Sequence, residues 1–225
     1  MGRLFALGIL GTCACAALAP HTLAQSTGSV TGTIATNAKG LAPVRVTIDQ
    51  KVCGQERPDD AIVVDGQGHL ANAVVILTGV KQPAGADTLV NNEKCHFAPR
   101  VQIVRPNSNV RTTSKDPVLH TTHAQLENGK TIFNVALPIP GITISKAIGG
   151  PGTVRLSCNT HPWMRGWMIV TDEAAAVSGA DGRFALSNIP AGTYELRVWH
   201  ESLTSPPQKV TVTAGKATDL QLQMK

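Results

Sequence analysis

The sequence predicts an all-β protein made of two β-sandwiches, and three observations support this fold class. Short segments rich in β-branched and aromatic residues, such as SVTGTIAT, RVQIVR and YELRVWH, recur along the chain. The 21 Gly and 14 Pro fall mostly between these segments, where turns require them. No stretch shows the periodicity of a long amphipathic helix. Regular short strands separated by turns are typical of β-sandwiches and barrels.

Residues 1–24 have the pattern of a secretory signal peptide. Arg3 precedes the apolar run LFALGILGTCACAALA, and Thr22 and Ala24 occupy the small-residue positions before a cleavage site. The run is too short for a membrane span, and no similar run follows it. We therefore expect an exported protein, periplasmic or secreted, whose mature chain begins near Gln25.

Export restricts how the cysteines can be used. Two of the five leave with the signal peptide, and Cys53, Cys95 and Cys158 remain in an oxidising compartment that favours pairing. Because three is odd, at least one thiol is left over or binds something. The simplest allocation is a Cys53–Cys95 disulfide, since either other pairing would consume the cysteine that lies beside His161.

The charge pattern excludes one class of partner. The net charge is +5, but the basic residues are scattered and form no run with interleaved aromatic residues. Nucleic acid is therefore not an expected partner. A mild positive charge suits an acidic protein partner, although simple solubility explains it equally well.

The segment SCNTHPWMRGW carries the chemistry of the chain, because it places Cys158, His161 and Met164 at three-residue intervals. Val154 and Leu156 share one face of the preceding strand with Cys158, so the thiol is expected to point inward. His161 and Met164 then lie on the loop that follows. A thiolate, two imidazoles and a weak thioether form the ligand set of an electron-transfer copper centre.

The second imidazole must come from another part of the chain. The upstream segment SKDPVLHTTHAQ offers His120 and His123, and folding can bring either over the ligand loop. A ligating imidazole also needs a hydrogen-bond partner for its other ring nitrogen.

These segments resemble the cupredoxin (blue copper) family of the amicyanin and plastocyanin type. CNTHPWM resembles its C-x-x-H-P-x-M ligand loop, and FAPRVQIVRPNSNVRTTSKDPVLH resembles the pattern before its first ligand histidine. The resemblance implies one type 1 copper ion held by His120, Cys158, His161 and Met164. It also implies a function in single-electron transfer between a redox donor protein and an acceptor.

The resemblance assigns other roles to two neighbours of His120. His123 becomes a non-ligand partner downstream of the metal. Thr121 stands where the family has an Asn whose side chain ties the two ligand loops together, and its shorter side chain can still form a hydrogen bond.

The flanks of the chain resemble a different family. ADGRFALSNIPAGTYELRV is similar to the carboxypeptidase regulatory-like (transthyretin-like) β-sandwich, and GSVTGTI and HLANAVVILTG resemble its early strands. The order of VCG, CHFAP, HPWMRG and WHE also resembles that of bacterial plastocyanin-like proteins labelled as methylamine-utilisation proteins. We therefore expect a cupredoxin Greek-key sandwich plus a transthyretin-like sandwich.

The expected divisions follow from these two resemblances. They are the signal peptide (1–24), N-terminal strands of the regulatory-like sandwich (25–91), the cupredoxin (92–171) and the C-terminal part of the regulatory-like sandwich (172–225). Two arrangements fit the sequence. Either the cupredoxin is inserted into the other sandwich, or the two domains follow each other in series.

Two further groups of residues could contribute to function. Trp163, next to Pro162, is expected to shield the metal or to form a docking patch around an exposed edge of His161. The pair His200–Glu201 could form a metal or acid–base element, or a hydrogen-bonded pair at an interface.

The predicted function is that of an electron-transfer protein and not of an enzyme. Two alternatives remain at this point. One is a copper enzyme with a second site built on His123 or on His200–Glu201. The other is a non-redox protein, either a copper carrier or a sandwich that binds a carbohydrate or a surface, because fold alone says little about function.

Overall fold

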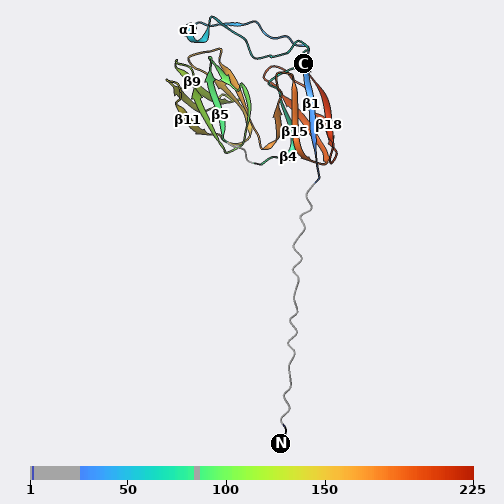
Figure 1. The fold of residues 1–225 in the computed structure, drawn as a ribbon. Coiled ribbons are helices and arrows are strands. Elements are labelled where there is room, and N and C mark those ends of the chain that lie inside the picture. Colours follow the sequence, from blue (N-terminus) through green and yellow to red (C-terminus); the bar gives the residue numbers. More distant parts are fainter. Residues whose placement is uncertain (1, 3–25, 84–86) are drawn as a thin grey trace.

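The computed structural model describes Gly2 and residues 26–83 and 87–225, and the regular secondary structure of these residues is almost entirely β-strand. The fold class is confirmed, since the strands form two β-sandwiches that lie side by side (Figure 1). Apart from Gly2, the predicted signal peptide, residues 1–24, lies outside the described residues. Within the described ranges, no helix is long and apolar enough to cross a membrane.

The flanking sandwich consists of a three-stranded sheet, in the order β15-β1-β18, and a four-stranded sheet, in the order β14-β4-β16-β17. Its strands are β1 (Thr27–Thr36), β4 (Val74–Lys81), β14 (Glu173–Val177), β15 (Arg183–Pro190), β16 (Gly192–Trp199), β17 (Gln208–Val212) and β18 (Ala217–Met224). The alternation of buried and partly buried residues in β1 is typical of a strand with one face on a core.

Both ends of the described chain meet in this sandwich. Strand β1 (blue) runs parallel to β18 (red), with residues 29–36 opposite residues 217–224 (Figure 1). Gly32 is required at this contact, because a Cβ atom there would lie 2.3 Å from the backbone oxygen of Leu220. The first described strand and β18 therefore lie next to each other in this sandwich.

The central sandwich has a five-stranded sheet, in the order β10-β9-β12-β13-β7, and a four-stranded sheet, in the order β11-β8-β5-β6. Its strands are β5 (Thr88–Glu93), β6 (His96–Ala98), β7 (Val101–Val104), β8 (Asn109–Ser114), β9 (His120–Leu126), β10 (Thr131–Leu137), β11 (Thr143–Ala147), β12 (Gly152–Ser157) and β13 (Arg165–Val170). Its core contains Cys158 and Met164.

The pairing of the strands shows how the two sandwiches are connected. Strands β5 to β13 pair only among themselves, while β1 and β4 pair with strands that follow β13. The central sandwich is thus inserted into the flanking one. It begins slightly earlier than the expected residue 92, because Thr88 to Asn92 pair in parallel with β8.

Residues 44–57 form a segment that we call the cap, which contains β2 (Val44–Arg45), α1 (Gln50–Cys53) and β3 (Glu56–Arg57). The sequence-based division placed it with the flanking strands, but it lies over one end of the central sandwich (Figure 1). Val46 and Cys53 belong to the central core and are at most 2% exposed. The predicted disulfide between Cys53 and Cys95 is present and tethers the cap.

The junction between the sandwiches has its own small apolar core. Val74 packs there with Val101 and Ile169, and Trp167 meets Trp199 with ring centroids 5.4 Å apart. Burial in such a core favours a fixed relative placement of the two sandwiches.

An ion pair and a histidine complete the junction. Glu201 accepts hydrogen bonds from the Arg100 guanidinium, and both side chains are almost fully buried. His200, 8% exposed, accepts a hydrogen bond at Nδ1 from the backbone N–H of Ser202. The structure records no bond between His200 and Glu201, so the expected pair is replaced by the Arg100–Glu201 pair.

Protonation of His200 is expected to weaken the fold. Burial, together with the nearby Arg100 charge, lowers the pKa of His200 from 6.5 to about 4. The unfolded chain binds a proton at higher pH than the folded chain, so this stabilisation is complete above pH 6.5 and lost as the pH falls through 4. In urea unfolding, the free energy of the wild type should fall more steeply across this window than that of His200→Asn, whose side-chain oxygen replaces Nδ1. The same dependence of the unfolding free energy on pH in both proteins would contradict the prediction.

Candidate metal centre

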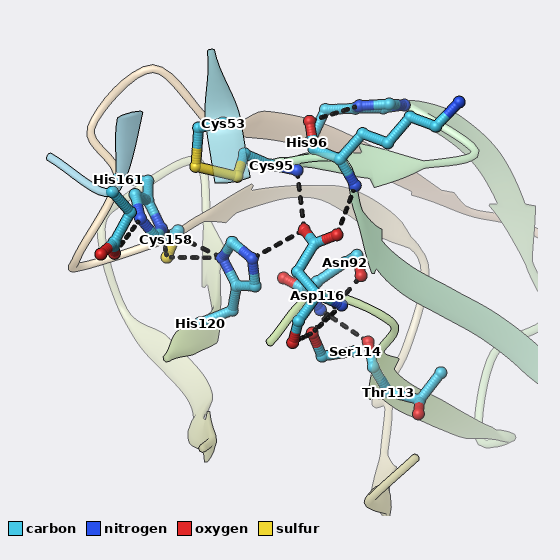
Figure 2. A network of polar contacts seen from close by, with 12 residues as sticks. Cys53, Asn92, Cys95, His96, Thr113, Ser114, Asp116, His120, Cys158 and His161 are labelled. Atoms are coloured by element: carbon cyan, nitrogen blue, oxygen red, sulfur yellow. Dashed lines mark hydrogen bonds and ion pairs between the residues drawn. A yellow bond between two sulfur atoms is a disulfide. The ribbon is translucent and has the colours of Figure 1, made fainter. Parts of the chain in front are cut away.

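Three predicted ligands converge at the capped end of the central sandwich. The Nδ1 atoms of His120 and His161 are 3.0 Å apart, and the Sγ atom of Cys158 lies 3.9 Å and 3.6 Å from them (Figure 2). Two atoms bound to one metal must lie closer than the sum of their bonds, about 4.2 Å for two nitrogens and about 4.4 Å for nitrogen and sulfur. All three separations meet this condition, so one ion can contact all three atoms.

The strands bring these side chains together. His120 is the first residue of β9, in which inward-facing residues alternate with outward-facing ones. Val154 and Leu156 are buried on β12, and Cys158 continues the same face, as the sequence predicted.

The ligand loop completes the set. His161 follows Cys158 on the loop and closes a turn in which the N–H of Met164 donates to its carbonyl oxygen. Met164 is 1% exposed and belongs to the same core as Cys158. Met164 is thus buried in the core that contains Cys158, and its thioether is the weak fourth ligand that the sequence predicts.

In each imidazole, the ring nitrogen that faces away from Cys158 contacts a carboxylate. Nε2 of His120 lies 2.9 Å from Asp116, and Nε2 of His161 lies 3.0 Å from Asp49. A carboxylate at one ring nitrogen keeps the proton there and leaves the other nitrogen unprotonated for a metal. The sequence analysis missed both carboxylates. Asp116 was visible four residues before His120, whereas Asp49 lies 112 residues from His161 and no local pattern marks it.

Asp116 also connects the site to the disulfide. Its carboxylate accepts hydrogen bonds of 2.7 Å from the backbone N–H groups of Lys94 and Cys95 (Figure 2). These two residues have positive φ angles of 51° and 57°, a conformation unfavourable for residues other than Gly. The two charge-assisted bonds help to hold the loop in this conformation.

Thr121 joins the two ligand segments. Its backbone N–H donates to the Cys158 sulfur at 3.3 Å, and its hydroxyl accepts a 2.7 Å hydrogen bond from the N–H of Asn159. The short side chain of Thr121 therefore bridges the first histidine segment and the ligand loop.

The surroundings change the protonation of two of the three groups. Burial acts to raise the pKa of the Cys158 thiol, but hydrogen bonds from His120, from the N–H of Thr121 and from His161 together lower this pKa to about 6. Burial acts to lower the pKa of His120, yet its bonds to Cys158 and Asp116 raise that pKa overall. The metal-free site thus favours a thiolate beside a histidine.

The expected exposed edge of His161 is absent, and that prediction was wrong. The His161 side chain is 0% exposed because the cap covers it, with Asp49 on Nε2. Trp163 is half-buried beside the ring, with centroids 5.0 Å apart, and its N–H donates to the carbonyl oxygen of Cys95. Trp163 therefore shields the site and secures the disulfide loop.

The remaining candidate residues lie away from the converging ligands. The ring nitrogens of His123 contact Asn159 and Thr131. Glu201 is bound to Arg100 at the junction, as described above. In the part of the chain that the structure describes, the other cluster with ligand-like spacing includes Cys95, whose sulfur is in the disulfide. None of these residues builds a second metal site there.

Comparison with known families agrees with the resemblance of the flanking sandwich. The family model of the carboxypeptidase regulatory-like domain matches residues 168–225. No curated protein matches the chain. Among solved structures, the chain is similar to a purple cupredoxin from Nitrosopumilus maritimus, with 22% identity and a TM-score of 0.34, over 38% of this chain and 100% of that chain.

Two further structures show similarity of the same order. A mutant of amicyanin in its Cu(I) form is 16% identical, with a TM-score of 0.33, over 43% of this chain and 98% of that chain. A copper-containing nitrite reductase from Thermus scotoductus SA-01 is 19% identical, with a TM-score of 0.33, over 42% of this chain and 24% of that chain. At these identities the similarity concerns the fold.

The thiolate of Cys158 should be measurable without any metal. As the pH of the metal-free protein rises through about 6, the ultraviolet absorption of one thiolate should appear. This pH is well below 9.0, the pKa of an ordinary thiol. The Cys158→Ser variant serves as the control and should show no such step. A step centred near 9 in the wild type would contradict the prediction.

Loss of the carboxylate in the cap should weaken metal binding. Removing a group that orients a metal-ligating histidine typically costs about 10–100-fold in metal affinity. Asp49→Ala should therefore lower the copper affinity by about that factor in competition with a chelator. Asp181→Ala, which removes an exposed carboxylate of the flanking sandwich, should leave it unchanged. Equal affinities for both variants would show that Asp49 does not position His161.

Proposed function

We propose that the mature chain is an exported type 1 copper protein, periplasmic or secreted, that transfers single electrons between a donor protein and an acceptor protein. The observation that carries the proposal is the convergence of His120, Cys158 and His161 in a buried site, with Met164 in the same core. A thiolate with two imidazoles and a weak thioether is a ligand set that favours copper in electron-transfer proteins.

The residues of the chain fit such an ion. His120, Cys158 and His161 would hold it, and Met164 would serve as the weak axial ligand. When bound, copper would supply one-electron chemistry by changing between its cuprous and cupric states.

The chain itself would limit rearrangement during electron transfer. Asp116 and Asp49 fix the orientation of the two rings, and Thr121 donates an N–H to the Cys158 sulfur. The three ligand side chains are at most 4% exposed, so water is excluded from the donor atoms. Ligands that are already in place before the metal binds need little movement when its charge changes.

The same burial argues against a copper enzyme. A catalytic metal keeps an open position for water or substrate, whereas the cap and Trp163 cover the His161 side of this site. The tight hydrogen bonding also argues against a carrier, which must release its metal readily.

A redox partner would have to approach over the cap or beside it. Ile48 of the cap and Leu119, which precedes His120, are each 44% exposed. Apolar residues of this kind beside the covered ring, and not Trp163, are the proposed contact for the partner proteins.

Copper loading tests the proposal directly. One equivalent of Cu(II) added to the mature protein should give an intense thiolate-to-copper absorption band and narrow hyperfine splitting in the EPR spectrum. Cys158→Ser and His120→Ala should lose the band. His123→Ala is the matched control, since His123 lies outside the ligand set, and should keep it. A colourless protein, or a spectrum without the band, would contradict the proposal, and bound copper above one per chain would favour an enzyme.

A further inference from the structure

A cleft between the two sandwiches contains chemistry that electron transfer does not use. Its volume is about 520 Å³, within the range of about 300–1,000 Å³ typical of small-molecule sites. One wall comes from β9, β12 and β13 of the central sandwich, and the other from the end of β16 and the residues that follow it. Ligand sites occur preferentially at such junctions between structural units.

Two indole rings form the apolar part of this cleft. Trp167 and Trp199 meet edge to face, at an interplanar angle of 61°, and both remain partly exposed. The Nε1–H group of Trp167 is buried and has no acceptor in the described part of the chain. Leaving a buried donor unpaired costs about 1–3 kcal/mol, so a ligand oxygen that reached it would be favoured.

Polar side chains surround the rings. Arg155 lies opposite Gln125 on one neighbouring strand and opposite Trp167 on the other, so these residues form one row across the sheet. The structure records no hydrogen bond or ion pair for the side chains of Arg155 or Glu127 within the described ranges. A guanidinium and a carboxylate are therefore both free at the cleft.

The WHE motif supplies further groups on the opposite wall. Because Nδ1 of His200 accepts the N–H of Ser202, the proton of the neutral ring is on Nε2, which is then a donor. Oε1 of Glu201 is engaged by Arg100, and Oε2 remains as an acceptor. The cleft lining thus offers both donors and acceptors.

This combination of groups favours a neutral, polar ligand. Because Arg155 and Glu127 carry opposite charges, the lining as a whole favours neither an anion nor a cation, and a purely apolar ligand would leave the buried Trp167 Nε1–H unpaired. A neutral polyhydroxylated ring has hydroxyl groups that both donate and accept, and a C–H face that can pack on an indole. We propose that this cleft binds a neutral saccharide, with Trp167 and Trp199 as its apolar contacts and Arg155, Glu127 and His200 as its polar ones.

The cleft contains none of the metal ligands, so the test of this site requires no copper. Titration of the full mature chain with cellobiose, followed by calorimetry and tryptophan fluorescence, should show saturable binding in the millimolar range. Arg155→Ala should weaken this binding at least about tenfold, which corresponds to about 1.4 kcal/mol. Arg155 is exposed and carries no recorded bond, so its removal should not affect folding.

A control variant and two charged sugars test whether the binding is specific to this cleft. Arg111→Ala removes another exposed arginine, from β8 in the opposite sheet, and should bind cellobiose like the wild type. Glucuronate and glucosamine, which add a negative or a positive charge, should bind no more tightly than glucose. Absence of saturable binding, equal binding by wild type and Arg155→Ala, or preference for a charged sugar would each overturn the proposal.

Discussion

The hydrogen bonds from the two imidazole Nε2 atoms to Asp116 and Asp49 are the constraint on which the site depends. Both rings are fully buried, and a buried N–H without an acceptor would cost about 1–3 kcal/mol. The two carboxylates come from unrelated parts of the chain, one just before β9 and the other from the cap. The orientation of the His161 ring therefore depends on the packing of the cap onto the central sandwich.

Cys95 connects the cap to the residues around the ligands. Its sulfur is bonded to Cys53 of the cap, its N–H donates to Asp116, and its carbonyl oxygen accepts from Trp163. A disulfide that closes a loop of this length stabilises a fold by about 4 kcal/mol in the chain-entropy model. Because the bridge lies next to Asp116, this stabilisation acts on the geometry of the ligands. It also uses the two cysteines that could otherwise pair with Cys158.

Local pattern was enough to predict much of this structure. Alternation in β12 placed Cys158 inward, the spacing of His161 and Met164 predicted the ligand loop, and the three cysteines outside the predicted signal peptide indicated one disulfide, Cys53–Cys95, and one unpaired thiol. The position of the cap could not be predicted in this way. Its contact with the site spans more than a hundred residues, and two two-residue strands and one helical turn leave no periodicity to detect. The expectation of an exposed His161 failed because it depended on this contact.

The flanking sandwich is connected to the candidate metal centre through Arg100. This residue binds Glu201 at the junction, donates to the carbonyl oxygen of Arg165, and accepts the N–H of Trp167 at its own carbonyl oxygen. Arg165 begins the strand that follows the ligand loop, one residue after Met164. The buried Arg100–Glu201 ion pair is thus bonded to the residue that follows the ligand loop. Removing one partner of a buried ion pair typically lowers the free energy of unfolding by about 3–5 kcal/mol. The flanking sandwich therefore helps to fix the position at which the ligand loop ends. This support is possible because the central sandwich is inserted into the flanking one and is connected to it at both ends.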